Sequence, residues 1–141
     1  MSAENSDYLA SQGFTLCPDL RGFSAFIGPF YERSYEAEIE RALAIENHHL
    51  NPEGVVHGGV LLSFADYAIY RAIGDVVSHD IQFATINLTT QFLAAAKQGD
   101  IVYGKGVITR KTRSVIFAQG ELYTRERSLM TASGIWKIIG Q

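Results

Sequence analysis

The chain has 141 residues, of which 47% are hydrophobic and 19% are charged, a composition typical of a folded globular domain and not of a disordered chain. Its 12 basic and 15 acidic residues give a net charge of −3, so we expect no nucleic-acid partner, since such binding requires an extensive basic surface. This length has no room for a second hydrophobic core, and we expect one domain over residues 1–141.

The cysteine content and the first residues favour a cytoplasmic protein. Cys17 is the single cysteine, which excludes an intramolecular disulfide and is compatible with a reducing compartment. The segment MSAENSDYLA at the start is partly acidic and lacks the apolar stretch of a signal peptide. No stretch reaches the ~18 apolar residues that a membrane span requires, so we expect no membrane contact.

The first part of the chain predicts few regular elements. Residues 1–28 predict a short helix over Asp7–Ser11 followed by irregular chain, and residues 30–49 predict two strands in a hairpin. The segment Asn51–Gly54, with the sequence NPEG, then marks a turn, because Asn, Pro and Gly each favour turn dihedral angles.

A long helix is predicted from Gly58 to Val77. Apolar residues in this segment fall on two adjacent rows with a spacing of four, which gives a helix of about five turns with a wide apolar face. The two rows are Val60, Phe64, Ala68, Ala72, Val76 and Leu61, Ala65, Ile69, Ile73, Val77.

Strands in an antiparallel meander are predicted after the helix, separated by short polar turns. Their ranges are Phe83–Phe92, Ile101–Thr109, Ser114–Thr124 and Leu129–Ile139. Together with the hairpin they predict the α+β class, with a curved antiparallel sheet of about five to six strands around a central helix, because a helix this apolar must be covered on most sides.

Two glycines, Gly58 and Gly59, stand at the predicted start of the helix. The N–H groups of the first helical turn have no partner within the helix and lie at the positive end of its dipole. Glycine also lets a ligand oxygen approach the backbone closely. The pair is compatible with an oxyanion hole, and also with an ordinary glycine-rich helix entry that packs against a strand.

An acidic residue, Asp66, lies at the edge of the apolar face, on the same row as Leu62 and Tyr70. A carboxylate that is partly withdrawn from water at this position would be strengthened as a base. The alternative is a boundary acid that is hydrogen-bonded to a neighbour such as Tyr70.

The spacing Asn-x5-His-Gly-Gly-x6-Asp in this region resembles that of the hotdog-fold acyl-CoA thioesterases. The resemblance is to the phenylacetate-degradation type of the 4-hydroxybenzoyl-CoA thioesterase-like superfamily, and it extends from about Phe23 onward. NPEGVVHGGVLLSFADYA is similar to the family signature, TINLTTQFLAAAKQGD to the strand and turn that follow, and GKGVITRKTRSVIFAQGELYT to the next hairpin. The fold that the resemblance implies agrees with the one predicted above.

The resemblance implies roles for the residues of this motif. Asp66 takes the place of the carboxylate that activates water or attacks the thioester. Gly58 and Gly59 take the place of the backbone N–H that polarises the thioester carbonyl. The residues implied to orient the carbonyl or to hold the attacking water are Asn51, His57 and Thr85.

The sequence departs from the family pattern at three places. One branch of the superfamily uses Glu at the helix position, so Asp66 favours the branch named above. The usual polar-Pro-Ala ending of a strand is replaced by Ala94–Ala96, and the usual Gly-Arg of the late hairpin is replaced by Lys111–Arg113.

The distance between the two parts of the motif predicts a shared site. Asp66 follows Gly58 by eight residues, which places it ~12 Å away along the helix axis. Hydrogen bonds of ~3 Å span such a gap with difficulty, so an antiparallel partner helix would have to supply the carboxylate. We expect a homodimer, with a dimer of dimers as an open alternative, and the resemblance implies the same because these enzymes place their sites at a dimer interface.

The densest basic cluster, Arg110, Lys111 and Arg113 beside Ser114, occupies a predicted hairpin turn. It is either a solvated turn or a site for the phosphates of CoA, since the guanidinium group matches phosphate geometry.

Other reactive side chains do not form a recognisable site. His48, His49 and His57 match no common metal-ligand spacing, so we expect no metal and no other cofactor. Cys17 has no base near it in the sequence, and we do not expect a catalytic thiol.

The predicted function is that of an acyl-CoA thioesterase, which hydrolyses acyl-CoA to a free acid and CoA. Two alternatives stay open: a non-catalytic acyl-CoA binder or sensor on the same fold, and a hotdog hydratase or dehydratase that would use His57. Binding alone requires no carboxylate at the carbonyl, and this favours the enzyme over the sensor.

Overall fold

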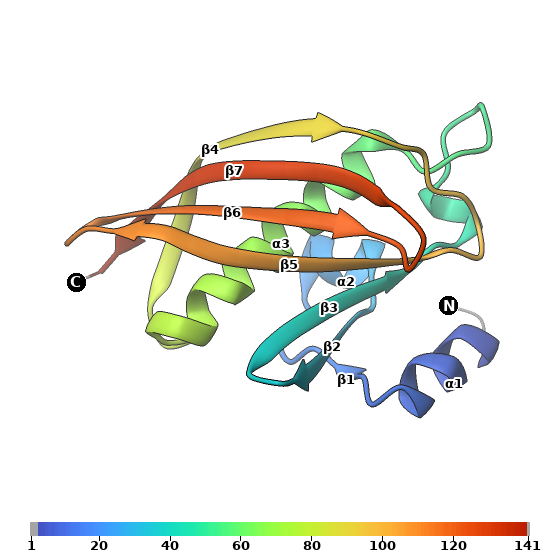
Figure 1. The fold of residues 1–141 in the computed structure, drawn as a ribbon, viewed down its shortest axis with the longest axis horizontal. Helices are drawn as coiled ribbons and strands as arrows, with labels where there is room; N and C mark the ends of the chain where they lie inside the picture. The colour runs from blue at the N-terminus through green and yellow to red at the C-terminus, as the bar shows by residue number, and fades with distance from the viewer. Residues whose placement is uncertain (1–2, 141) are drawn as a thin grey trace.

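The computed structural model describes residues 3–140 and shows a long helix lying across one face of a curved sheet (Figure 1). In chain order the elements are α1 (Ala3–Ser11), β1 (Thr15–Leu16), α2 (Gly22–Ile27), β2 (Phe30–Tyr35), β3 (Glu38–Ala44), the 3-10 turn η1 (Asn47–His49), α3 (Gly58–Val77), β4 (Gln82–Phe92), β5 (Ile101–Lys111), β6 (Val115–Tyr123) and β7 (Ser128–Ile139). None of the helices within residues 3–140 combines the length and apolar character that crossing a membrane requires.

The sheet is antiparallel and its strands lie in the order β1-β2-β3-β5-β6-β7-β4. The predicted α+β architecture, with a sheet curved around the helix, is therefore confirmed. The expected strand number was too low, because the sheet has seven strands and includes the two-residue β1. The predicted meander is wrong for β4, which pairs with β7 and not with β5. The connection 93–100 crosses the sheet, so that the next strand, β5, lies beside β3 with β6 and β7 between it and β4.

The N-terminal lead-in is more regular than the sequence suggested. The predicted helix is present as α1, but the chain after Ser11 is not irregular, since it forms β1 and the short helix α2. Ile27 of α2 is buried in the main core. The side chains of Leu9 and Phe14 pack with Tyr31 and Tyr103 in a second, smaller core. A helix of six residues carries too little periodicity to be recognised in a sequence.

The helix α3 begins and ends at the predicted residues, and it provides the centre of the main core. Its approach to the sheet depends on glycines in β5 and β6. A Cβ on Gly120 would lie 2.6 Å from the carbonyl oxygen of Lys105 and 2.7 Å from the side chain of Ile69 in α3. A Cβ on Gly106 would lie 3.0 Å from the Cβ of Ala72. The absence of side chains at these two positions lets α3 approach β5 and β6 closely.

Candidate active site

The first turn of α3 is capped by the side chain of His57. The N–H of Gly59 donates to His57 Nδ1 at 2.8 Å, and the N–H of Val60 donates to the His57 carbonyl at 2.9 Å. Among residues 3–140 no acceptor lies at the N–H of Gly58, so this group is the first-turn donor that remains available to a ligand. Because His57 Nδ1 accepts a hydrogen bond, the proton of the neutral ring is on Nε2.

The loop before α3 is shaped by Asn51. Its side-chain oxygen accepts hydrogen bonds from the N–H groups of Glu53 (3.0 Å) and Val55 (3.2 Å), and its backbone N–H donates to the Val55 carbonyl at 2.8 Å. These bonds are those of an Asx turn, in which a short polar side chain replaces a backbone partner. Asn51 thus holds the loop that presents His57 and Gly58, and it is half-buried.

A buried histidine, His49, ties this loop to α2. Its Nδ1 accepts from the N–H of Glu46 at 2.9 Å, its Nε2 donates to the carbonyl of Ile27 at 2.6 Å, and its own carbonyl accepts from the N–H of His57 at 2.8 Å. Only the neutral ring can make both ring contacts, and burial lowers the pKa of His49. Sequence reasoning considered His49 only as a metal ligand, since nothing in the residue type separates it from the exposed His48.

The carboxylate of Asp66 is held by Thr85 of β4. The Thr85 hydroxyl donates to Asp66 Oδ1 at 2.8 Å, across the contact between α3 and β4. Tyr70, which the sequence suggested as a partner of this acid, packs edge-on against Phe83 with ring centroids 5.7 Å apart. Asp66 is half-buried and Thr85 is exposed, so the pair is open to a ligand.

A β-bulge sets the faces of β4. Thr85 pairs with Trp136 and Asn87 with Ile135, so Ile86 is an extra residue in the ladder. In a regular strand, residues separated by an odd number of positions point to opposite faces. The bulge places both Thr85 and Phe92 on the face toward α3, where the Phe92 ring would lie 3.3 Å from a Cβ on Gly58.

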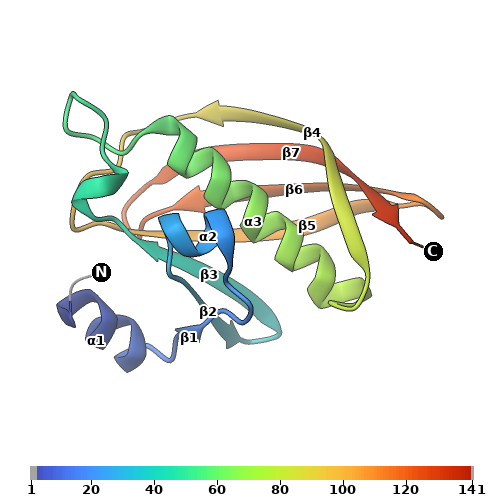
Figure 2. The ribbon, with the colours of Figure 1, turned by 180° about the vertical axis from the view of Figure 1, so that it is seen from behind.

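These contacts define a seam along α3 and β4, which consists of Gly58, Leu62, Asp66 and Tyr70 on the helix and Phe83, Thr85 and Phe92 on the strand. Figure 2 shows β4 starting beside the C-terminal end of α3 and ending near its N-terminal end. Gly58 and Asp66 share the row but remain eight residues apart in a continuous helix, which is ~12 Å along its axis. One chain does not bring them together.

The basic residues of the β5–β6 hairpin lie far from the seam in the same chain. Arg110, Lys111, Arg113 and Ser114 are all exposed, and Arg110, Lys111 and Arg113 form no ion pair within residues 3–140. The ladder from Thr85 runs through Trp136 and Ile116 to Lys111. Three strand spacings of ~4.8 Å separate its two ends, which is about 14 Å.

The sequence profile of the thioesterase superfamily matches residues 53–131, which is more than half of the chain and includes the whole seam. The chain belongs to this superfamily. It is also 27% identical over 113 residues to a Pseudomonas aeruginosa protein described as a candidate esterase, and this match covers 79% of the chain and 84% of the relative.

Solved structures of thioesterases have the same fold. A hypothetical thioesterase of Streptococcus pneumoniae, solved with coenzyme A, gives a TM-score of 0.68 at 19% identity over 91% of this chain and 97% of that one. A candidate thioesterase of Ralstonia eutropha, described as related to phenylacetic acid degradation, gives 0.66 at 22% identity over 93% of this chain and 89% of that one. These likenesses establish that this member of the superfamily has the hotdog fold.

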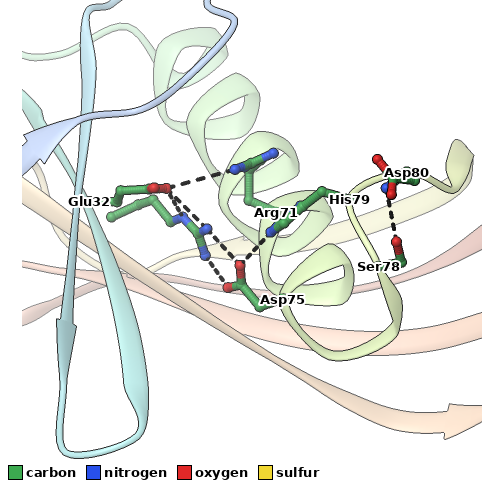
Figure 3. Close-up of polar contacts among 7 residues, drawn as sticks. Glu32, Arg71, Asp75, Ser78, His79 and Asp80 are labelled. Carbon is green, nitrogen blue, oxygen red and sulfur yellow. Dashed lines mark hydrogen bonds and ion pairs between the residues drawn. The ribbon is translucent and has the colours of Figure 1, made fainter.

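A second polar cluster lies around Asp75, near the C-terminal end of α3 (Figure 3). Asp75 follows Asp66 by nine residues, or two and a half helical turns, so it lies on the opposite side of the helix. Arg41 is 1% exposed and donates to both oxygens of Asp75 (2.5 and 3.0 Å) and to Glu32, while His79 lies 2.8 Å from Asp75. Burial alone would raise the pKa of Asp75, but the hydrogen bonds and charge of Arg41 outweigh it and lower that pKa. Asp75 also borders a cavity of about 730 Å³ beside β5, so this cavity is not at the Asp66 side of the helix.

The remaining reactive side chains do not converge on the seam. Within the described part of the chain, no three His, Cys, Asp or Glu side chains are placed to hold a metal ion. Cys17 is buried, and this burial raises the pKa of its thiol to about 11, so it is a poor nucleophile at neutral pH.

Proposed function

We propose that this chain is an acyl-CoA thioesterase whose active site lies at the seam of α3 and β4. The observation that carries the proposal is the half-buried Asp66 carboxylate, oriented by the Thr85 hydroxyl at 2.8 Å and lying on the same helix row as the available N–H of Gly58. A carboxylate base and an oxyanion donor are the two groups that hydrolysis of a thioester requires. Membership of the thioesterase superfamily supports the reaction, and the coenzyme A held by the Streptococcus pneumoniae structure supports the substrate class.

In this proposal the N–H of Gly58 donates to the thioester carbonyl oxygen. Asp66 takes a proton from a water molecule, and the water oxygen attacks the carbonyl carbon while the carbonyl π electrons move onto the oxygen at Gly58. When the tetrahedral intermediate collapses, the C–S bond breaks and the CoA thiolate takes the proton from Asp66. The products are the free acid and CoA, and no cofactor takes part. Thr85 orients the carboxylate, while His57 and Asn51 hold the loop that positions Gly58.

We further propose that each site combines Gly58 of one subunit with the partner's Asp66. The edge strand β4 supports this, since among residues 3–140 it lies at the end of the strand order and pairs on one side only, with β7. Antiparallel pairing of two β4 strands across a two-fold axis would extend both sheets. In one such register, Phe92, which lies by Gly58, pairs opposite the partner's Thr85. The two-fold axis then passes near Leu62 and the middle of β4. This arrangement brings Gly58 of one subunit close to the partner's Asp66.

His57 is less suited to the alternative of a hydratase or dehydratase. A catalytic base needs an unprotonated ring nitrogen directed at substrate, but Nδ1 of His57 accepts the hydrogen bond from Gly59. The sensor alternative gives no role to the Thr85–Asp66 hydrogen bond. Both alternatives are outcomes of the assay below.

The test is release of free thiol from a set of acyl-CoA esters. We expect turnover by the wild-type protein, a loss of kcat of at least ~10²-fold in Asp66→Asn, and a loss of about tenfold or more in Thr85→Val, which removes one hydrogen bond to a charged group. Asp80→Asn, at an exposed acid after α3, is the matched control and should retain wild-type activity. Binding without thiol release would identify a sensor, and hydration of an enoyl-CoA would identify a hydratase.

A further inference from the structure

Phe92, the last residue of β4, lies against the start of α3. Two atoms of its ring would lie 3.3 and 3.4 Å from a Cβ on Gly58, and the side chain is nevertheless 55% exposed. The ring therefore borders the N–H of Gly58, which is the first-turn donor available to a ligand. The ring and the N–H thus belong to the same small region of the surface, and a group whose oxygen accepts this N–H lies near the Phe92 ring.

The surroundings of this donor are apolar. Leu62, one turn further along α3 on the row between Gly58 and Asp66, is 38% exposed, and Leu93, directly after Phe92, is 56% exposed. The strand β4 has the sequence QFATINLTTQF and contains no charged residue over its whole length. On the helix row of the seam, Asp66 is the only charged side chain. An apolar group beside Gly58 would cover these side chains, whereas a charged group would find no counter-ion on the seam.

The position of Phe92 depends on the bulge at Ile86. Without the extra residue, Phe92 and Thr85 would point to opposite faces of the sheet. The bulge therefore places an aromatic ring at the donor end of the seam and the Thr85 hydroxyl at the carboxylate end. Bulges next to active sites commonly redirect a side chain in this way.

We propose that Phe92, together with Leu62, determines acyl specificity, and that the site takes CoA thioesters of apolar acyl groups and rejects acyl groups that end in a carboxylate. This inference rests on the proposed function and goes beyond it by naming the acyl class and the residue that selects it. The acyl chain packs on the Phe92 ring while its carbonyl oxygen accepts the N–H of Gly58. Each methylene group that is buried there strengthens binding by about fourfold.

The first experiment measures binding, so that its result does not depend on turnover. Dissociation constants of CoA and of acetyl-, butyryl-, hexanoyl- and succinyl-CoA are determined by calorimetry with the Asp66→Asn protein. We expect hexanoyl-CoA to bind at least tenfold more tightly than acetyl-CoA, and butyryl-CoA at least tenfold more tightly than succinyl-CoA, which has the same number of acyl carbons but a carboxylate in place of the terminal methyl group. Equal affinity across the series would overturn the proposal.

The second experiment changes the ring in the same background. Phe92→Ala should remove most of the dependence on chain length while leaving the affinity for CoA itself within about twofold, and Phe92→Leu should restore part of it. The matched control is Phe117→Ala, because Phe117 lies on the sheet face away from α3, between the buried Ile116 and Ala118. It should keep the wild-type dependence on chain length.

The possible results separate this inference from the proposed function. Wild-type protein that releases no thiol but binds long acyl-CoA through Phe92 would refute the hydrolase and retain the acyl site. A Phe92→Ala protein that loses affinity equally for CoA and for every ester would place the ring at the pantetheine arm and overturn the acyl assignment. An unchanged chain-length dependence in Phe92→Ala would overturn it as well.

Discussion

The ion pairs of Arg41 and of Lys105 differ sharply in the environment of their side chains. The side chain of Arg41 is 1% exposed and forms ion pairs with both Asp75 and Glu32, whereas Lys105 and Glu38 form a 2.6 Å pair with side chains that are 42% and 68% exposed. A buried charge that loses its partner costs several times more than an exposed one, because water cannot reach it. The buried ion pairs of Arg41 therefore stabilise the packing of β3 against the C-terminal part of α3.

Replacing the two basic residues by methionine tests this difference. We expect Arg41→Met to lower the free energy of unfolding by about 3 kcal/mol, because Asp75 and Glu32 then lose their buried counter-ion and keep only His79 and the more distant Arg71. Lys105→Met, the control, should lower it by about 1 kcal/mol or less. Urea unfolding at neutral pH measures the stability of both variants. A similar loss of stability in the two would show that the ion pairs of Arg41 contribute no more than an exposed pair.

At the candidate site, the sequence alone was sufficient for some residues and not for others. The row of Gly58, Leu62 and Asp66 follows directly from helical periodicity, so it could be predicted. The resemblance proposed a role for Thr85, but its contact with Asp66 depends on a bulge that shifts the strand by one residue, and strand periodicity does not reveal such a shift. The spacing of four residues made Tyr70 a reasonable partner for Asp66, but the Tyr70 ring packs edge-on against Phe83 of β4.

Among the secondary-structure elements, the loop before α3 depends on α2 through His49. The buried ring joins the carbonyl of Ile27 to the N–H of Glu46, and its backbone carbonyl holds the N–H of His57. The short helix α2, which the sequence did not reveal, therefore supports the turn that presents Gly58. Long periodic elements such as α3 could be predicted, whereas this support comes from contacts between segments that are distant in the sequence.

The lowered pKa of His49 makes stability depend on pH. Its ordinary value is 6.5, and below that pH the unfolded chain binds a proton before the folded chain does. The free energy of unfolding should therefore fall as the pH falls from about 6.5 to about 5, a range that lies above the titration of most carboxylates. Urea unfolding of the wild type should show this slope. His49→Gln should be less stable at neutral pH but have a flatter slope, and His48→Gln should retain most of the slope, because burial is the largest cause of the lowered pKa of His49. A wild-type stability that is constant over this range would contradict the role of His49.

The hairpin between β5 and β6 is a rigid element with unpaired basic side chains at its end. The Thr112 hydroxyl donates to the carbonyl of Val115 at 2.8 Å and accepts from its N–H at 3.1 Å, which fixes the turn. Arg110, Lys111 and Arg113 extend from it without counter-ions within residues 3–140. An unpaired guanidinium on a fixed turn is suited to phosphate groups, so of the two interpretations of this cluster we propose the contact with the phosphates of CoA.

Neutralising Arg113 tests that contact. We expect Arg113→Gln to raise KM for acyl-CoA with little change in kcat, because a phosphate contact is the same in the ground state and the transition state. The KM for the corresponding acyl-pantetheine, which lacks the nucleotide, should not change. Arg21→Gln, at an exposed arginine before α2, is the control. Equal effects on both substrates would place the hairpin away from the CoA site.

At the scale of the whole molecule, one chain contains both halves of a site but keeps them apart. The N–H of Gly58 and the carboxylate of Asp66 lie on one face of a regular helix, so no small movement of side chains closes the ~12 Å between them. The β4 edge and the exposed Leu62 lie between the two halves, where a two-fold axis would bring Gly58 to the partner's Asp66. A fold predicted for one chain from its sequence contains both groups, but in the proposed site one of the two comes from the partner subunit.

Mixing two inactive proteins decides whether the site is shared. One parent carries Asp66→Asn, and the other carries Gly58→Leu, whose side chain would meet Phe92 and cover the backbone donor. If each site takes one group from each subunit, a heterodimer has both lesions in one site and an intact second site. Exchange after mild dissociation should then restore up to roughly a quarter of wild-type activity, because half of the dimers are mixed and each has one working site.

The control is Asp66→Asn mixed with Asp66→Asn/Gly58→Leu, whose heterodimer has no intact site and should stay inactive. If mass spectrometry confirms subunit exchange and the first mixture also stays inactive, each subunit must complete its own site, and the assignment of Asp66 to the partner is wrong.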